Sequence, residues 1–137
     1  MMKFARMTAL TTLCFSLFTH NCLADTCPSP TEIAQGQFNN WVAYVMSTYP
    51  IPATPAQIQA FQTYNNLAFA YALWHATLPP LPGVCVYTDP GIVLAKNVPQ
   101  PLVSKGTWQE ESRLGQIIYT CMISDPTKCI FGTVPHK

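Results

Sequence analysis

The chain has 137 residues, of which seven are Lys or Arg and six are Asp or Glu. So few charges exclude the basic face that a nucleic-acid-binding protein needs, and the length suits one ordinary domain. Beyond the first 24 residues no apolar stretch is long and unbroken enough to span a membrane.

Residues 1–24 have the pattern of an export signal. Lys3 and Arg6 form a short positive region, an apolar run follows, and small residues precede a cleavage position after Ala24. Thr and Ser interrupt the apolar run, which is too short for a retained transmembrane helix. We therefore expect an exported chain whose mature domain comprises residues 25–137.

Four cysteines remain in this mature chain: Cys27, Cys85, Cys121 and Cys129. An even number in an exported chain predicts two disulfides, for which three pairings are open. Asp125-Pro126 is a turn signal between Cys121 and Cys129, so a hairpin would bring these two together and leave Cys27 for Cys85. Cys27 has no nearby His or C-x-x-C partner to lower its pKa, which favours a structural role.

The N-terminal elements follow from local signals. Ser29 and Glu32 have capping-box spacing with Pro30 at the first helical position, which predicts a short helix through about Phe38. Residues 40–47 are rich in β-branched and aromatic side chains and are predicted to form a strand. Three prolines in residues 48–55 then predict an irregular connection.

The next segment is ambiguous between helix and strand. Thr54-Pro55 with Gln57 can cap a helix, so residues 56–65 are left open. Large and small residues alternate from Leu67 to His75, with Phe69, Tyr71 and Leu73 among the large ones. This period of two is typical of a strand buried on both faces, and we predict a strand over 66–75.

The C-terminal half predicts two hairpins. Residues 84–87 and 92–96 flank a turn at Asp89-Pro90-Gly91. Residues 115–123 and 129–134 would form the second hairpin, after a loop over 100–108. The predicted fold is α+β and mainly β: a single small antiparallel sheet domain with a short N-terminal helix and two disulfides.

A segment without charge is the most informative feature of the chain. No Asp, Glu, Lys or Arg occurs between Glu32 and Asp89. A buried sheet with neutral loops explains this, and so does a contact face, because interface cores are poor in charge and rich in Tyr and Trp. Strand tryptophans such as Trp41 and Trp74 are more often core. The candidate contact residues are Trp41, Tyr44, Tyr49 and Tyr64.

Catalytic patterns are weak. The predicted strand places His75 on the face of Tyr71 and Leu73 near a strand end, where a satisfied or edge histidine is commoner than a general base. Glu110-Glu111 is interpreted as a charged turn, and His136 lies in the C-terminal tail. No nucleophile elbow, zincin or phosphate-loop motif occurs. We expect no catalytic residues, no metal, no cofactor and no enzymatic activity.

Short elements in a fixed order carry a resemblance: CPSP at 27–30, FAYALW at 69–74, CVY at 85–87, Trp108, and Cys121 followed by CIF at 129–131. This order resembles EirA-like periplasmic proteins, small exported proteins of intracellular gammaproteobacterial pathogens that are associated with the type IV secretion system. The resemblance covers nearly the whole mature chain.

The resemblance implies a periplasmic, non-enzymatic accessory protein. Such a protein would support type IV secretion, and hence virulence and intracellular replication, through contacts with envelope proteins; the resemblance supplies no site residues. The alternative is a small secreted ligand-binding protein or hydrolase that acts outside the cell and uses His75. The oligomeric state and the identity of the partner stay open.

Overall fold

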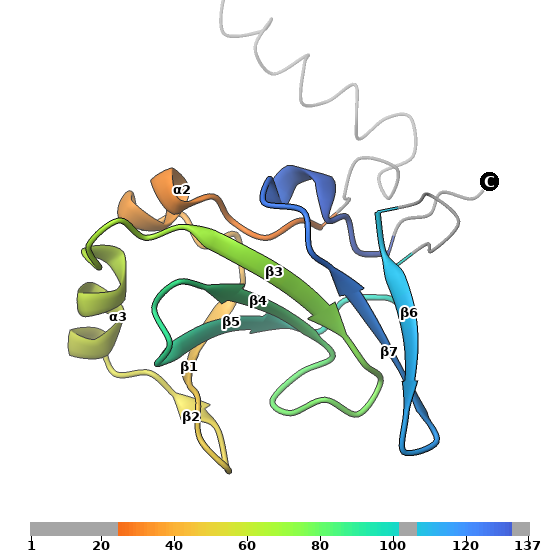
Figure 1. Cartoon of the computed structure of the whole chain (residues 1–137). Helices are drawn as coiled ribbons and strands as arrows, with labels where there is room; N and C mark the ends of the chain where they lie inside the picture. Colours follow the sequence, from red (N-terminus) through yellow and green to blue (C-terminus); the bar gives the residue numbers. More distant parts are fainter. Residues whose placement is uncertain (1–24, 102–106, 133–137) are drawn as a thin grey trace, which may run out of the picture.

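A seven-stranded antiparallel sheet in the order β2-β1-β5-β4-β3-β7-β6 lies at the centre of the molecule (Figure 1). The strands are β1 Val42–Val45, β2 Ile51–Pro52, β3 Phe69–Trp74, β4 Gly83–Tyr87, β5 Ile92–Lys96, β6 Gln109–Arg113 and β7 Gln116–Cys121. This computed structural model describes residues 25–101 and 107–132. The predictions for the export signal and for His136 lie outside the described residues. The mainly β prediction of a single antiparallel sheet is confirmed.

Two short helices begin at capping boxes. Helix α2, Pro30–Ala34, starts where the Glu32 N–H donates to Ser29 Oγ at 3.1 Å and the Ser29 N–H donates back to Glu32 Oε1 at 2.8 Å. Helix α3, Pro55–Gln62, starts with the same reciprocal pair between Thr54 and Gln57. The predicted N-terminal helix is therefore confirmed, although it ends at Ala34, and the open segment is helical through Gln62.

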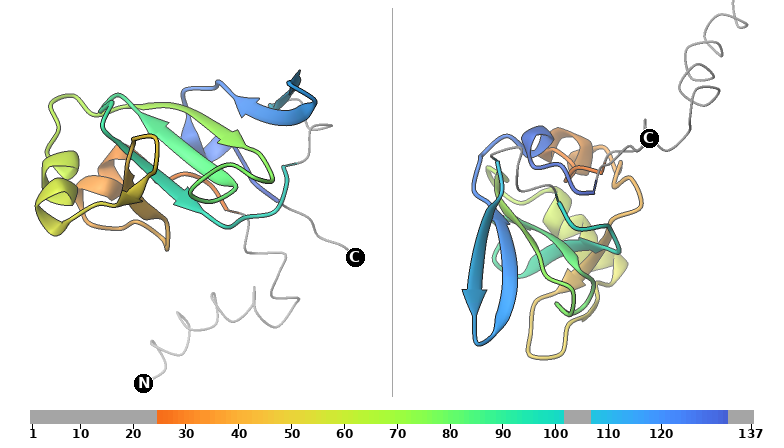
Figure 2. Two further views of the ribbon diagram at one scale, coloured as in Figure 1. Left: turned by 90° about the horizontal axis from the view of Figure 1, so that it is seen from below. Right: turned by 90° about the vertical axis from the view of Figure 1, so that its right-hand side faces the viewer.

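One face of the sheet packs against these helices and the N-terminal segment, as Figure 2 shows. Aromatic rings fill this main core: the centroids of Trp41 and Phe131 lie 5.4 Å apart, and those of Phe61 and Tyr87 lie 5.6 Å apart. On the opposite face, which we call the second face, a smaller cluster contains the buried side chains of Val84, Val93 and Ala95. This second face is where the candidate site lies.

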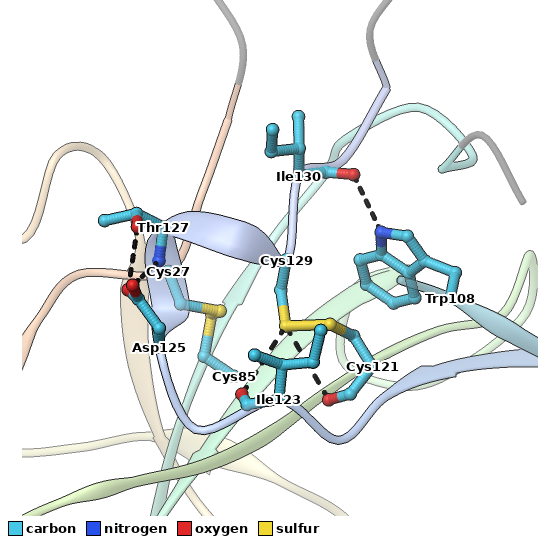
Figure 3. The surroundings of a disulfide bond; sticks show 9 residues. All are labelled: Cys27, Cys85, Trp108, Cys121, Ile123, Asp125, Thr127, Cys129 and Ile130. Carbon is cyan, nitrogen blue, oxygen red and sulfur yellow. Dashed lines mark hydrogen bonds between the residues drawn. A yellow bond between two sulfur atoms is a disulfide. The ribbon is translucent and has the colours of Figure 1, made fainter. Parts of the chain in front are cut away.

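Both predicted disulfides are present. Cys27 bonds to Cys85 and so joins the N-terminal segment to β4, while Cys121 at the end of β7 bonds to Cys129 (Figure 3). All four cysteines lie in the main core and are at most 1% exposed. Two bonds of this kind fit an oxidising compartment outside the cytoplasm.

The second hairpin was predicted wrongly. Strand β7 pairs with β6 on one side and β3 on the other, and the described residues 129–132 form no strand with it. The turn signal starts a 3-10 helix, Pro126–Lys128, because the Asp125 carboxylate accepts the Thr127 N–H at 3.0 Å and caps the turn. Strand β6 carries Glu110-Glu111, which we had interpreted as a turn.

Two further elements differ from the prediction. Residues 48–55 contain the short strand β2, whose Ile51 is the register partner of Val45 in β1. In β3 the register shifts between Phe69 and Tyr71. The strand itself is confirmed, but this bulge switches the alternation, so that Phe69 lies in the main core while Leu73 packs on the second face.

Candidate functional site

The four candidate contact residues do not share one surface. Trp41 is only 3% exposed and packs against Phe131, so its assignment to a contact surface is corrected to the main core. Tyr49 follows β1 and is 82% exposed, whereas Tyr64 follows α3 and is 39% exposed. Tyr44 is half-buried and packs against the second-face cluster.

Two adjoining hollows cross the second face, and together we call them the second-face groove. The larger, of about 410 Å³, extends from Met46 over β4 and β5 to the prolines at 79–80. The smaller, of about 350 Å³, is bounded by β6, β7 and the exposed side chain of Met122. The side chains of Tyr71 and Leu73 line both hollows, so the two hollows meet at β3.

The strand register explains why this face is apolar. Val42 and Tyr44 of β1 are the partners of Ala95 and Val93 of β5, and these residues alternate with main-core residues along each strand. Every second residue therefore points to the second face. Neither α2 nor α3 of the described chain packs on the second face. The segment 75–82 covers part of it, since Leu78 and Leu81 pack against the cluster of Val84, Val93 and Ala95.

Charge is confined to the two ends of the groove. Asp89 lies at one end, where its carboxylate accepts the Gly91 N–H at 2.9 Å. At the other end Arg113 Nη2 lies 3.0 Å from Glu111 Oε1 on the exposed strand β6. The side chains between these ends are uncharged, so the groove can bury an apolar segment while its ends meet polar groups.

His75 belongs to the scaffold of the second face. It is 7% exposed, and its backbone N–H donates to the Pro82 carbonyl at 3.1 Å. Its ring Nδ1 accepts the backbone N–H of Thr77 at 3.1 Å. These bonds close the segment 75–82 over the sheet. His75 is not among the residues that line either hollow. The structure therefore places His75 near the strand end, as predicted, and its ring is held by the hydrogen bond from Thr77.

Two side chains away from the groove have shifted pKa values. Burial raises the pKa of the Tyr87 phenol, and the negative charge of Glu32 raises it further. The hydroxyl and then the N–H of Thr127 lower the pKa of Asp125. Both shifts follow from local packing and capping contacts, so neither indicates an acid or base for catalysis.

Within residues 25–101 and 107–132, no three His, Cys, Asp or Glu side chains are grouped so that they could hold a metal ion. Over the same ranges no helix has the length and apolar character needed to cross a membrane.

No family model, curated protein or solved structure matches this chain. The charge-free segment pointed to the region of the groove, but Met46, Tyr71 and Leu73 were missed as site residues. One signal was available: strands 84–87 and 92–96 are apolar at both alternating positions, and the chain offers too few helices to cover two faces.

Proposed function

We propose that this protein is a periplasmic accessory protein that binds an envelope protein through the second-face groove and so supports type IV secretion. The export-signal pattern and the two disulfides support a location outside the cytoplasm. The link to the secretion system is supported by the resemblance of the sequence to EirA-like proteins. Protein contact, rather than catalysis, is supported by the apolar groove.

The observation that carries this proposal is an apolar hollow on the second face, which the segment 75–82 covers only in part. An antiparallel sheet that leaves one face to water normally presents polar side chains there. Here Met46, which lines the groove, and Val42, which the register with Ala95 puts on the same face, are 49% and 43% exposed. Both belong to the charge-free segment. Apolar surface of this kind, bordered by polar residues, marks interaction sites on small proteins.

The occupant we propose is an uncharged, apolar segment of an envelope protein. A charged segment would lose its hydration over Val86 and Val93 of the larger hollow, where the lining strand residues carry no charge. Asp89 at one end and the Glu111–Arg113 pair at the other provide polar contacts where such a segment leaves the groove. This arrangement of an apolar centre and a polar border is typical of protein interfaces.

Cross-linking in the envelope tests this function. The tagged protein is cross-linked in the cells that produce it, and periplasm, membrane and medium are assayed separately. Met46→Lys places a charge at the groove, so we expect it to lose the recovered secretion component; Ile130→Lys is the matched control, since Ile130 is 41% exposed and does not line the groove. Equal recovery with both variants, or intact secretion after deletion of the gene, would refute the proposal.

A small-molecule carrier is the second candidate function. The larger hollow of about 410 Å³ falls within the range of about 300–1,000 Å³ that is common for ligand pockets. A carrier would be found as free monomer in the medium, and its unfolding temperature would rise with apolar small molecules. Met46→Lys would remove that rise, whereas an unchanged unfolding temperature across such compounds would exclude this function.

A further inference from the structure

The hairpin of β6 and β7 forms an arm that extends past the rest of the sheet (Figure 1). Strand β7 pairs with β3 only through Tyr119–Cys121. The outer half of the hairpin, residues 111–118, pairs only within itself: Arg113 is the partner of Gln116, and Glu111 is the partner of Ile118. An isolated two-stranded ribbon is only marginally stable in water, so this outer half of the hairpin adds little to the stability of the domain.

Leu114 at the tip of this arm has an unfavourable backbone conformation. Leu114 and Gly115 connect the strands with φ angles of +52° and +79°. Two central residues with positive φ form the turn that favours Asn-Gly, because the Cβ of a bulky residue crowds its own carbonyl. The other non-glycine residues with positive φ in the described chain are all asparagines: Asn39, Asn40 and Asn66.

The Leu114 side chain is also fully exposed. Its relative exposure is 101%, the highest of the large apolar residues in the part of the chain that the structure describes. Leucine therefore improves neither the turn nor the packing of the free domain. Charged groups border it, since Arg113 precedes it and pairs with Glu111 at 3.0 Å.

We propose that Leu114 is an anchor residue that enters an apolar pocket of a partner protein, with Arg113 and Glu111 contacting the polar border of that pocket. An apolar anchor surrounded by polar contacts is the usual arrangement of an interface hot spot. Strain at an exposed position is retained where a functional contact requires it. This inference rests on the proposed function, because it assigns a second contact point for the envelope protein.

The charges on the arm favour a protein over a lipid surface. Leu114 and the exposed Ile117 of β7 together bury too little apolar area for stable membrane attachment, which needs a second signal such as a basic cluster. The described part of the arm has Arg113 as its basic residue, and this side chain already pairs with Glu111. A carboxylate beside the tip would also be repelled by anionic lipids.

The variant Leu114→Asn separates the effect of Leu114 on the stability of the free domain from its effect on partner binding. Asparagine suits the turn, so we expect the free variant to unfold at a higher temperature than the native domain. Its affinity for the partner should fall about ten- to hundredfold, the range expected when one buried leucine is lost. If Leu114 served only to stabilise the free domain, Leu114→Asn would instead unfold at a lower temperature. Unchanged affinity for the partner would overturn the proposal. Ile130→Asn is the control at a comparably apolar exposed position.

A photoreactive phenylalanine derivative at position 114, compared with one at position 130, identifies what the tip contacts in cells. We expect a discrete adduct from position 114 alone, with the cross-link mapped to apolar residues of an envelope protein. The proposal would be overturned if position 114 gave no adduct, or an adduct of twice the chain's mass, which would indicate a second copy of this chain. It would also be overturned if the native protein, but not Leu114→Asn, floated with vesicles of phosphatidylethanolamine and phosphatidylglycerol, which would indicate a lipid surface.

The two proposals fail separately. If Met46→Lys abolishes recovery of the envelope protein while Leu114→Asn binds it normally, the anchor is wrong and the groove stands. If position 114 yields an adduct with a protein that has no part in secretion, the anchor stands and the proposed function is wrong.

Discussion

The hydroxyl of Tyr87 donates a hydrogen bond of 2.6 Å to the carbonyl of Pro28, across 59 residues of sequence. Pro28 follows Cys27, whose disulfide to Cys85 lies two residues from Tyr87 on the same strand. The N-terminal segment is thus held to β4 by a covalent bond and a buried hydrogen bond side by side. Cys27, Cys85 and Tyr87 all belong to the main core, so this pair of contacts fixes the N-terminal segment to it.

Tyr87→Phe should destabilise the domain by about 1–3 kcal/mol, because the buried Pro28 carbonyl would lose its partner. Tyr87 is 2% exposed, so water cannot readily replace the hydroxyl. Chemical denaturation followed by tryptophan fluorescence measures the change. Tyr49→Phe is the control at an exposed tyrosine, and an equal, negligible effect in both variants would contradict the argument.

The two disulfides should contribute unequally to stability. Cys27 and Cys85 are 58 residues apart in sequence, whereas Cys121 and Cys129 are 8 apart. On the chain-entropy account, loss of the long-range bond costs about 4 kcal/mol and loss of the short-range bond about 2.5 kcal/mol. Paired Cys→Ala variants, compared by denaturation, test this order, and the reverse order would show that packing around the sulfurs decides instead.

Gly83→Ala should destabilise the sheet although Gly83 lies in an ordinary strand. A Cβ at this position would overlap Val98 Cγ2 and lie 3.2 Å from the Lys96 carbonyl oxygen, and such overpacking costs about 1–3 kcal/mol. Gly91→Ala is the control, since its Cβ would meet only Asp89 Oδ1 at 3.6 Å.

Val98→Ala should recover part of the stability that Gly83→Ala loses, because it removes the methyl group that would be overlapped. Unfolding free energies of the two single variants and the double variant form a cycle that measures this coupling. Strictly additive losses would show that the clash with Val98 is not the cause.

Asp125 should make stability depend weakly on acid pH. Its pKa is lowered in the folded state, chiefly by the Thr127 hydroxyl, so the contribution is complete above the ordinary value of 3.8 and is lost as pH falls through the lower folded value. Asp125→Asn keeps an acceptor oxygen but removes the titration. Denaturation midpoints at neutral and acid pH should therefore differ less in Asp125→Asn.

Thr127→Val serves as the companion variant for this pH dependence. It removes the hydroxyl that donates to Asp125 Oδ1 at 2.7 Å, so it should also flatten the acid loss of stability. If Asp125→Asn, Thr127→Val and the native protein lose stability in parallel as the pH falls, other carboxylates carry the dependence.

The elements that could be predicted depend on neighbours in sequence. The capping box at Ser29 and the turn at Asp89-Pro90-Gly91 each act within a few residues, and the structure has α2 and the β4–β5 hairpin there. The disulfide pairing was reached partly through a wrong hairpin: the turn signal at Asp125-Pro126 does bring Cys121 to Cys129, but through a 3-10 helix.

The candidate site was harder to predict because its residues meet only across strands. Tyr71 and Leu73 come from β3, Met46 follows β1, and Arg113 lies at the far edge of the sheet. The bulge after Phe69 reverses the face on which the following residues lie, and no local signal in the alternation marks it. The core position that the sequence favours for Trp41 is confirmed, whereas its listing as a candidate contact residue is wrong, because contact with Phe131 from the other end of the chain buries it.

By itself the sequence determined the antiparallel, mainly β class, the capped first helix, the four paired cysteines and a segment free of charge, because each of these depends on composition or on short-range geometry. Only the tertiary structure decided which face of the sheet carries the groove, which strands β7 pairs with, and that Leu114 is exposed at the tip of the β6–β7 hairpin. These features are set by strand order and register, which arise from packing between residues far apart in the chain.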